Sequence, residues 1–405
     1  MKKRVLSLCS LALIAGLTLT SCSIDINDGL GNEGNTIMTP PTDGILPNGG
    51  ILEGSITKDL LIKKGNYTLK GVVKVAAGVT LTIEAGANFT AQTASSLVIL
   101  QDGKINAQGT ASEPIVFTTA TKTPGDWGGI TLYGNAPIKA ANGNTSANSE
   151  DGNNLSYGGT DTNSNSGIMK FVRVEYAGKK IGDGTSETNS MTFYAVGAGT
   201  ILENLVAYKG TDDGYEFFGG TVSAQNLVSY GNYDDSFDWQ DAWSGQNNTN
   251  WYAFQTGTGN FGMEIEASGN ADNIAPKISN VSLIRDANTN PESANSAEIS
   301  AIQFKKQGSG IFSNVFISGY KNIGSQKAYS VLIQDAATET SQVNANKIKV
   351  EPINYINSDQ AGVWGYAYTP ANAKTFTNTN TVNKVSLVPG AWATVDGVNL
   401  LAALQ

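Results

Sequence analysis

The sequence predicts an all-β protein built as a solenoid, in which short strands coil around one long axis. Three observations predict this fold: a 22-residue repeat in the middle of the chain, a composition typical of turn-rich β-proteins, and short runs of β-forming residues between turn residues. A fixed period of roughly 20 to 50 residues indicates a solenoid, because each repeat buries its apolar face only by stacking on its neighbours.

The repeat is visible as two pairs of segments. Residues 204–208 (Asn-Leu-Val-Ala-Tyr) and 212–217 (Asp-Asp-Gly-Tyr-Glu-Phe) are followed 22 positions later by residues 226–230 (Asn-Leu-Val-Ser-Tyr) and 234–239 (Asp-Asp-Ser-Phe-Asp-Trp). Elsewhere, short runs such as residues 79–83 (Val-Thr-Leu-Thr-Ile) alternate with Gly and Asn. Runs of this length suit the small parallel sheets of a coiled solenoid.

A recurring apolar–polar–Asn–apolar signature predicts one corner of each coil. Its asparagines are Asn204, Asn226, Asn280 and Asn314, and Phe171 takes the same place in a variant copy. Asn tolerates the left-handed backbone conformation that a sharp corner requires. We expect each amide to bond the Asn of the neighbouring coil, forming a ladder. The first and the third residue after each of these asparagines should face the core.

The composition excludes several classes of function. Charged residues make up only 15% of the chain and Gly is abundant at 46 residues, whereas the hydrophobic fraction of 40% is sufficient for a packed core. The net charge is −9, which argues against nucleic acid as a partner, since phosphates need a basic surface. The same acidity leaves room for divalent cations such as calcium.

The chain contains no histidine, so catalytic triads with histidine and histidine-based zinc sites are excluded. Its two cysteines are Cys9 and Cys22. Cys9 falls in a predicted signal peptide, and Cys22 would then be the only cysteine of the mature chain. The monomer therefore has no disulfide, and neither a cysteine zinc site nor a free catalytic thiol is expected.

The N-terminal residues predict export from the cytoplasm and attachment to a membrane. Residues 1–4 are a basic start, and residues 5–19 form an apolar segment of about 15 residues, shorter than the roughly 20 that a membrane span needs. Residues 19–22 (Leu-Thr-Ser-Cys) resemble a bacterial lipobox, which implies cleavage before Cys22 and acylation of this residue. The acyl chains would anchor the protein to a membrane, and residues rich in Gly, Asn, Pro and Thr would follow as a tether.

Three longer strings carry a family resemblance. They are residues 125–130 (Gly-Asp-Trp-Gly-Gly-Ile), 171–178 (Phe-Val-Arg-Val-Glu-Tyr-Ala-Gly) and 212–221 (Asp-Asp-Gly-Tyr-Glu-Phe-Phe-Gly-Gly-Thr). With them the chain resembles right-handed parallel β-helices of the pectate-lyase-like fold, and within that fold a mostly uncharacterised family of Bacteroidota-type surface lipoproteins. The resemblance implies an outer-membrane protein that is lipid-anchored and exposed on the cell surface.

The expected organisation has four parts. Residues 1–21 are the signal peptide, 22–50 the flexible tether, 51–325 the parallel β-helix, and 326–405 the end of the β-helix with a less regular C-terminal cap. Within the cap, residues 398–404 are expected to form a short helix over the open end of the core. Residues 139–167 have almost no apolar content and are expected to be a mobile surface loop.

The repeat also stacks carboxylates from one coil to the next. Two unit charges about 5 Å apart repel by roughly 3 kcal/mol at an effective dielectric near 20. Three interpretations stay open: solvated or structural turns, since Asp favours turns; a calcium site, since this cation prefers oxygen ligands; and catalytic carboxylates. The stacked pairs are Asp212 over Asp234, Asp213 over Asp235, and Glu216 over Asp238.

Aromatic residues gather just after the acidic repeat and predict a sugar-binding face. Trp243, Trp251 and Tyr252, with Asp241 between them, would supply a stacking surface and hydroxyl acceptors for a polysaccharide. Trp239 aligns with Phe217 and is expected to be a stacked aromatic between coils. Trp127 is expected to be a core aromatic.

A complete catalytic constellation is missing from the sequence. The pectate-lyase-like resemblance implies that a lyase would combine calcium with an Arg or Lys base, yet Arg173 and Arg285 are the only arginines after Cys22, and neither lies in a recognisable lyase motif. We therefore expect a non-catalytic surface coat or scaffold, or a glycan-contacting protein, with contacts between copies in a surface lattice. The alternatives are a calcium-assisted polysaccharide lyase or glycoside hydrolase, and a surface subunit of a nutrient-uptake complex.

Overall fold

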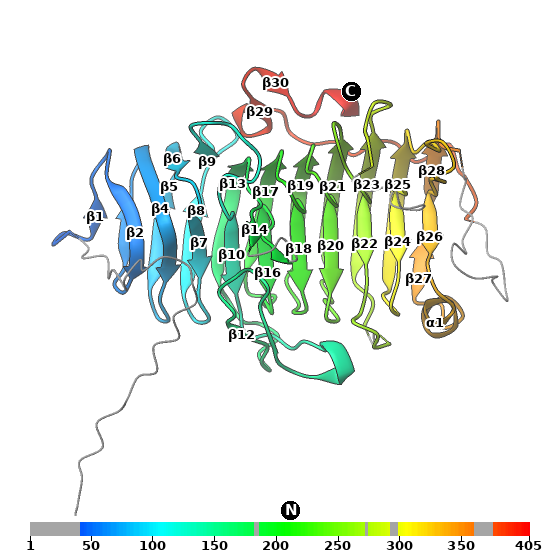
Figure 1. Ribbon diagram of the computed structural model, residues 1–405, viewed down its shortest axis with the longest axis horizontal. Coiled ribbons are helices and arrows are strands. Elements are labelled where there is room, and N and C mark those ends of the chain that lie inside the picture. The colour runs from blue at the N-terminus through cyan, green and yellow to red at the C-terminus, as the bar shows by residue number, and fades with distance from the viewer. Residues whose placement is uncertain (1–40, 182–185, 272–273, 292–298, 360–375) are drawn as a thin grey trace, which may run out of the picture. The chain divides into compact units, whose positions relative to one another are not determined.

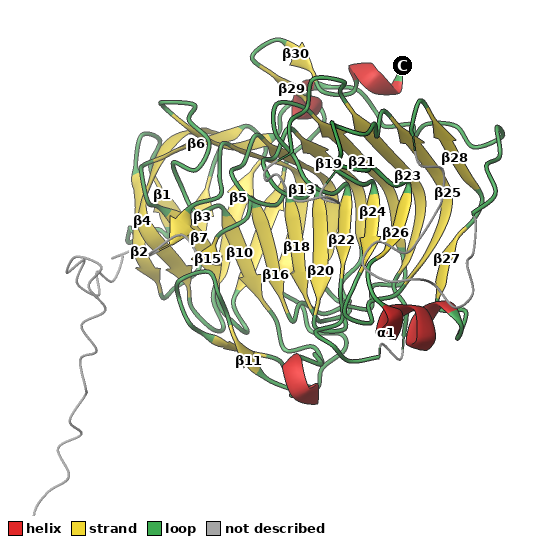
Figure 2. Cartoon of the chain, turned by 45° about the vertical axis from the view of Figure 1, so that its right-hand side comes forward, coloured by secondary structure: helices red, strands yellow, loops and turns green. Residues whose placement is uncertain are grey.

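A computed structural model describes residues 41–181, 186–271, 274–291, 299–359 and 376–405 (Figures 1 and 2). The strands of the 24-stranded sheet pair in parallel, coil upon coil, and the apolar side chains that point inward form one continuous core. The predicted signal peptide, the predicted lipidation site at Cys22 and most of the predicted tether lie outside the described residues. Among the residues that are described, no helix is both long enough and apolar enough to cross a bilayer.

The coils have three faces, which we call sheets A, B and C. Sheet A consists of β1 (Ile45–Leu46), β3 (Leu60–Ile62), β5 (Thr80–Glu84), β8 (Lys104–Gln108), the first halves of β13 (Gly167–Glu175), β17 (Ile201–Tyr208), β19 (Ala224–Tyr230), β21 (Asn248–Gln255), β23 (Lys277–Arg285) and β25 (Gly310–Ser318), and β27 (Ile348–Val350).

Sheets B and C complete each coil. Sheet B consists of the first halves of β2 (Ile51–Ile56) and β4 (Gly65–Val75), then β6 (Ala87–Ala91), β9 (Ile115–Thr119), the second halves of β13, β17, β19, β21, β23 and β25, and β28 (Ile353–Ile356). Sheet C consists of the second halves of β2 and β4, then β7 (Ser96–Ile99), β10 (Ile130–Tyr133), β16 (Met191–Tyr194), β18 (Tyr215–Phe218), β20 (Phe237–Gln240), β22 (Met263–Ile265), β24 (Ile302–Phe304) and β26 (Val331–Ile333).

The remaining elements lie outside the three sheets. They are η1 (Ala141–Gly143), β11 (Ala147–Asn148), β12 (Ser156–Tyr157), β14 (Lys180–Ile181), β15 (Ser186–Glu187), α1 (Ala336–Thr338), η2 (Glu339–Val343), η3 (Ala391–Ala393), β29 (Thr394–Val395), β30 (Val398–Asn399) and η4 (Ala402–Leu404).

These arrangements confirm the predicted right-handed parallel β-helix. Its limits differ from those expected at one end: β1 already pairs with β3, so the predicted tether of residues 22–50 ends before Ile45. At the other end, β26, β27 and β28 continue the sheets beyond residue 325.

The asparagine ladder is present as predicted and turns the chain from sheet A into sheet B. Asn204, Asn226, Asn250, Asn280 and Asn314 all have a positive φ, between 55° and 59°. Each amide nitrogen donates to the side-chain oxygen of the preceding ladder residue, at 3.0, 2.8, 3.1 and 3.0 Å in chain order. The residues that follow each corner alternate inward, as expected.

We predict that Asn226→Ala destabilises the fold by about 2–4 kcal/mol, because alanine loses both ladder bonds and is strained at a φ of 57°. Asn226→Gly is the matched control, since glycine loses the bonds but adopts positive φ without strain. Guanidinium unfolding of the three proteins measures the two contributions. An alanine variant as stable as the glycine variant would show that the corner carries no backbone strain.

The C-terminal segment differs from the short helix that was predicted to cover the end of the core. Residues 398–404 form β30 and η4 instead of a continuous helix, and they do not cover the end of the core. Trp392, Val395 and Leu400 of this segment pack against the outer face of sheet B, burying Val206 and Val228 in mid-rod (Figure 1). The reason is that sheet B carries outward apolar side chains there, and burying them against the segment is favourable.

Candidate functional site

Carboxylates line up on the outer face of sheet C. Glu216 of β18 pairs in register with Asp238 of β20, and Asp238 with Glu264 of β22. The flanking residues in each strand point into the core, so these three side chains point outward. We call Glu216, Asp238 and Glu264 the acidic row. The stacking of Glu216 over Asp238 was predicted from the repeat and is confirmed.

The turns that lead into β18 and β20 carry the other acidic residues of the repeat. Asp213 and Asp235 are both buried, and each holds the backbone of the next coil. The Asp235 amide donates to Asp213 Oδ1 at 2.9 Å, and the Phe261 amide donates to Asp235 Oδ1 at 2.7 Å. Asn189 has the same role one coil earlier, toward the Asp213 amide at 3.3 Å. These turns are therefore structural, but each Asp uses only one oxygen for the backbone bond.

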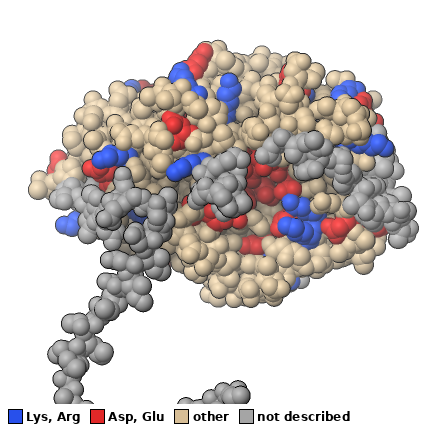
Figure 3. Space-filling view, viewed as in Figure 1, with Lys and Arg blue, Asp and Glu red and all other residues tan. Residues whose placement is uncertain are grey.

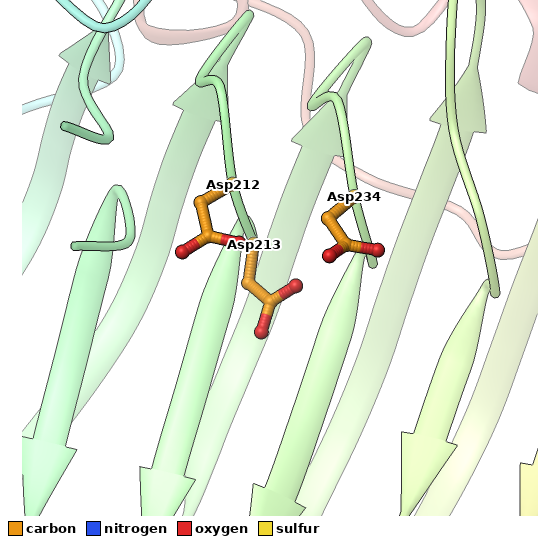
Figure 4. A group of neighbouring side chains, drawn as sticks. All are labelled: Asp212, Asp213 and Asp234. Carbon is orange, nitrogen blue, oxygen red and sulfur yellow. The ribbon is translucent and has the colours of Figure 1, made fainter. Parts of the chain in front are cut away.

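The carboxylates come together in three overlapping groups, in each of which one oxygen per residue lies within 4.8 Å of the others. One group is at the rim, and Figure 4 shows its three carboxylates turned toward a common space. The other two are deeper and share Asp238. In the space-filling view the acidic residues gather near the middle of the face, with basic residues beside them (Figure 3). The groups are Asp212, Asp213 and Asp234 at the rim; Asp213, Glu216 and Asp238; and Asp235, Asp238 and Glu264.

Asp238 stands out within the deeper groups. Its side chain is buried, and Oδ1 has no hydrogen-bond partner among the described residues. By contrast, Glu216 accepts hydrogen bonds from the Asn189 amide and from Gln240 Nε2, the latter at 3.2 Å. A buried carboxylate oxygen without a donor is unfavourable, because its desolvation is not compensated. The position therefore calls for a proton or a cation.

The electrostatics of the cluster agree with this need. Burial raises the pKa of Asp213, Glu216, Asp235 and Asp238 well above the ordinary range, and neighbouring carboxylates raise it further. For Asp213 the largest of these neighbours is Asp212. Without a cation, the folded protein thus holds protons at carboxyl groups that are ionised in the unfolded chain.

We predict that the chelator-treated protein is more stable at pH 5 than at pH 8. A carboxyl group whose folded pKa is raised above its usual 3.8 contributes most stability at low pH, and this contribution is lost as pH rises through the folded pKa. Asp359 and Asp396 act in the opposite direction because their pKa values are lowered, but both are solvent-exposed ion pairs of small effect. Thermal unfolding across pH measures the slope, and equal midpoints at pH 5 and 8 would contradict it.

One basic side chain enters the cluster from the far end of the row. Lys305 follows β24, and its Nζ lies 2.6 Å from Glu264 and 3.6 Å from Glu266. Burial alone would lower the pKa of Lys305, but Glu264, Asp238 and Glu266 outweigh it and hold the pKa above its ordinary value. This lysine is therefore a fixed positive charge at neutral pH. It is not a proton acceptor.

The predicted sugar-stacking face is not on the surface, so that prediction is wrong. Trp243 and Trp251 are fully buried, and their indole nitrogens donate to the carbonyl oxygens of Val222 and Ala224, both at 3.0 Å. Their rings stack on Phe217 inside the coil. Trp251 follows the corner residue of its coil and therefore points inward, where a glycan has no access.

Tyr252 and Asp241 are also inaccessible, each for a different reason. Tyr252 points outward from sheet B, but the C-terminal segment covers it completely. Asp241 accepts hydrogen bonds from Tyr157 and Ser268, which close over it. The expectations for two other aromatics are confirmed: Trp239 pairs in register with Phe217, and Trp127 is a buried core residue.

Tyr157 belongs to the insertion of residues 139–167, which was expected to be a mobile loop. Instead it packs against outward side chains of sheet C, and Figure 2 shows its strand β11 below the lower ends of the sheet C strands. Its Asp151 is buried and accepts a 2.7 Å hydrogen bond from Tyr133, a residue of the stacked aromatic column Tyr133, Tyr194 and Phe218. The insertion is held by polar contacts and by this apolar column, which explains its order despite its polar composition.

The two arginines are committed to the scaffold. Arg173 pairs with Glu175 at 2.5 Å and donates to the carbonyl oxygens of Ala391 and Thr394, at 2.6 and 2.9 Å. It points outward, as expected, but the C-terminal segment covers it. Arg285 donates to backbone carbonyl oxygens around residues 259–260, and burial lowers its pKa to about 10.

Sequence reasoning missed four polar residues of the site: Glu264, Lys305, Asn189 and Gln240. Glu264 lies 26 positions after Asp238 instead of 22, because the turn between their coils is longer. The alternation of residues 263–265 (Met-Glu-Ile) is the signal that places this carboxylate outward. The same alternation places the Lys305 side chain outward, because Ile302 and Phe304 point into the core.

The donor set fits calcium. It consists of carboxylate oxygens, which hard cations prefer, and Asp213, Glu216 and Asp238 bring three of them together. The unpartnered Asp238 oxygen is the observation that favours a cation over a purely structural cluster. Asp212, Asp234 and Asp235 lie around these three as further candidate ligands.

A family model described as a pectate-lyase like beta helix domain matches residues 54–393. The chain belongs to this family. No curated protein matches the chain, and no solved structure matches it either. The region that this pectate-lyase like beta helix family covers runs from β2 to η3, so the whole acidic cluster lies inside it.

Proposed function

We propose that this β-helix is a non-catalytic protein of the outer cell surface that binds calcium at the acidic row and contacts polysaccharide there. The observation that carries the proposal is the buried group of Asp213, Glu216 and Asp238, with an unpartnered oxygen on Asp238. The bound ion would neutralise charges that otherwise repel, and it would offer its open coordination positions to glycan oxygens. The lipobox at Cys22 supports anchoring by acyl chains, which detergent phase partition of the wild type and Cys22→Ala tests.

Two features of the cluster favour binding over turnover. One oxygen from each of the three carboxylates lies within 4.8 Å of the others, an arrangement that one cation can bridge. A lyase needs a neutral base near the bound sugar, whereas Lys305 is held protonated by its carboxylate neighbours and Arg173 is covered.

Affinity electrophoresis of the protein through gels that contain different polysaccharides tests the proposal. We expect retardation by at least one polysaccharide in calcium and none in chelator, since the ion would be the contact point. Asp213→Asn should abolish the retardation, and Glu84→Gln, an exposed carboxylate far from the cluster, is the matched control. Uniform mobility across a broad panel would contradict glycan contact and leave the coat or scaffold role.

A second candidate, a calcium-assisted polysaccharide-degrading enzyme, is favoured by the raised pKa of Asp213, Asp235 and Asp238. A carboxylic acid that stays protonated near neutral pH has the property that a general acid needs. Release of sugar fragments that disappears in Asp213→Ala or Asp235→Ala, but persists in Glu84→Gln, would establish this enzyme in place of the binding protein.

A further inference from the structure

The two deep groups of the cluster differ in their charge balance. No basic side chain contacts Asp213 or Glu216 among the described residues, so the group that they form with Asp238 has no internal counter-charge. The next group, one coil further along the rod, contains Glu264, and Lys305 Nζ lies 2.6 Å from that carboxylate. The rod repeats the carboxylates, but not the charge that balances them.

We infer that Lys305 is a built-in cation that fills the second position of the acidic row and thereby limits the row to one divalent ion. The inference rests on the proposed function, because it requires calcium to bind between Asp213, Glu216 and Asp238. The Lys305 ammonium lies 2.6 Å from Glu264 and so engages the carboxylate that a second ion would need together with Asp235 and Asp238. Its lasting charge also repels such an ion, because strands of neighbouring coils lie only about 4.8 Å apart.

The surroundings of Lys305 are those of a resident charge. Its side chain is only 18% exposed, and Glu266 provides a second carboxylate at 3.6 Å. Glu266 is bound in turn by the exposed Lys306 at 2.6 Å. Gln303 of β24 lies two positions before Lys305 and points outward on the same side. It pairs in register with Glu264, and its Oε1 is buried without a partner among the described residues. Once the ammonium is removed, this amide oxygen would be an additional ligand for a metal ion.

Calcium stoichiometry of the full chain in detergent, after chelation and measured by equilibrium dialysis and calorimetry, tests the inference. We expect one ion for the wild type and two for Lys305→Met, which keeps an unbranched side chain one atom shorter but removes the charge. Lys305→Arg is the matched control and should bind one. Binding of two ions by the wild type, or of one by a folded Lys305→Met variant, would overturn the inference. A wild type that binds none would instead overturn the proposed function.

A second variant keeps the test decisive if Lys305→Met does not fold. In our assignment Glu264 serves the lysine and not the ion, so Glu264→Gln should bind one calcium ion with an affinity within about threefold of the wild type. Asp238→Asn should lose at least a hundredfold in affinity in the same titration. A tenfold loss in Glu264→Gln would mean that the second group binds the ion, and Lys305 would then have no such role.

Discussion

Replacing Asp238 with asparagine should raise the stability of the protein in chelator and remove its stabilisation by calcium. In chelator the wild type must hold a proton on Asp238 or bury an unpartnered charge beside Glu264, and asparagine avoids both costs. In calcium the wild type should gain about 2.7 kcal/mol at an ion concentration 100 times the dissociation constant, whereas the variant should gain almost nothing.

Thermal unfolding of both proteins, each in chelator and in calcium, gives the four values needed. The two effects have opposite signs, so general damage by the mutation cannot imitate them. Glu84→Gln again serves as the control, and its calcium response should equal that of the wild type. A variant that is less stable in chelator and keeps the full calcium response would show that Asp238 is a structural residue only.

Trp251→Ala should lower the free energy of unfolding by about 3–5 kcal/mol, among the largest effects of any single substitution in this chain. The indole is fully buried and packs on the rings of Phe217 and Phe237, with centroid distances of 5.9 and 4.8 Å. Its removal leaves a large cavity and an unpaired carbonyl oxygen at Ala224. Trp251→Phe is the matched control and should lose less, since it keeps most of the ring.

Guanidinium unfolding followed by near-ultraviolet circular dichroism measures the loss. Because solenoids can unfold in parts, amide hydrogen exchange in the neighbouring strands β19 and β23 should be followed in the same samples. If Trp251→Ala were as stable as the wild type but lost retention by polysaccharides, the residue would be a surface ligand contact after all.

The fold and its corners were predictable because their signals are local and repeat in the sequence. Asn204 and Asn226 recur at the spacing of one coil, and a left-handed corner needs a residue of this type. The same rule would have placed Trp251 in the core, since it follows Asn250 as Leu227 follows Asn226. The two-coil repeat does not include Asn250, so it gives no register for Trp251.

The remainder of the site depends on distances that the sequence does not encode. Glu264 and Lys305 join the acidic cluster only because turns of different length bring their strands into register. The order of the insertion depends on contacts outside it: Asp151 accepts from Tyr133 of sheet C, and Tyr157 donates to Asp241, 84 positions further along the chain. The composition of the insertion shows how little apolar surface it has. It does not show which hydrogen bonds its polar side chains make in the folded protein.

The asparagine ladder also makes the rod electrically directional. The amides of Asn226, Asn250, Asn280 and Asn314 all donate toward the preceding coil, so their side-chain dipoles point the same way and polarise one another. Cutting such a chain in its middle leaves two short chains, whereas removing its last member leaves one long chain. The same substitution should therefore be more costly at Asn250 than at Asn314, although both residues occupy the same kind of corner.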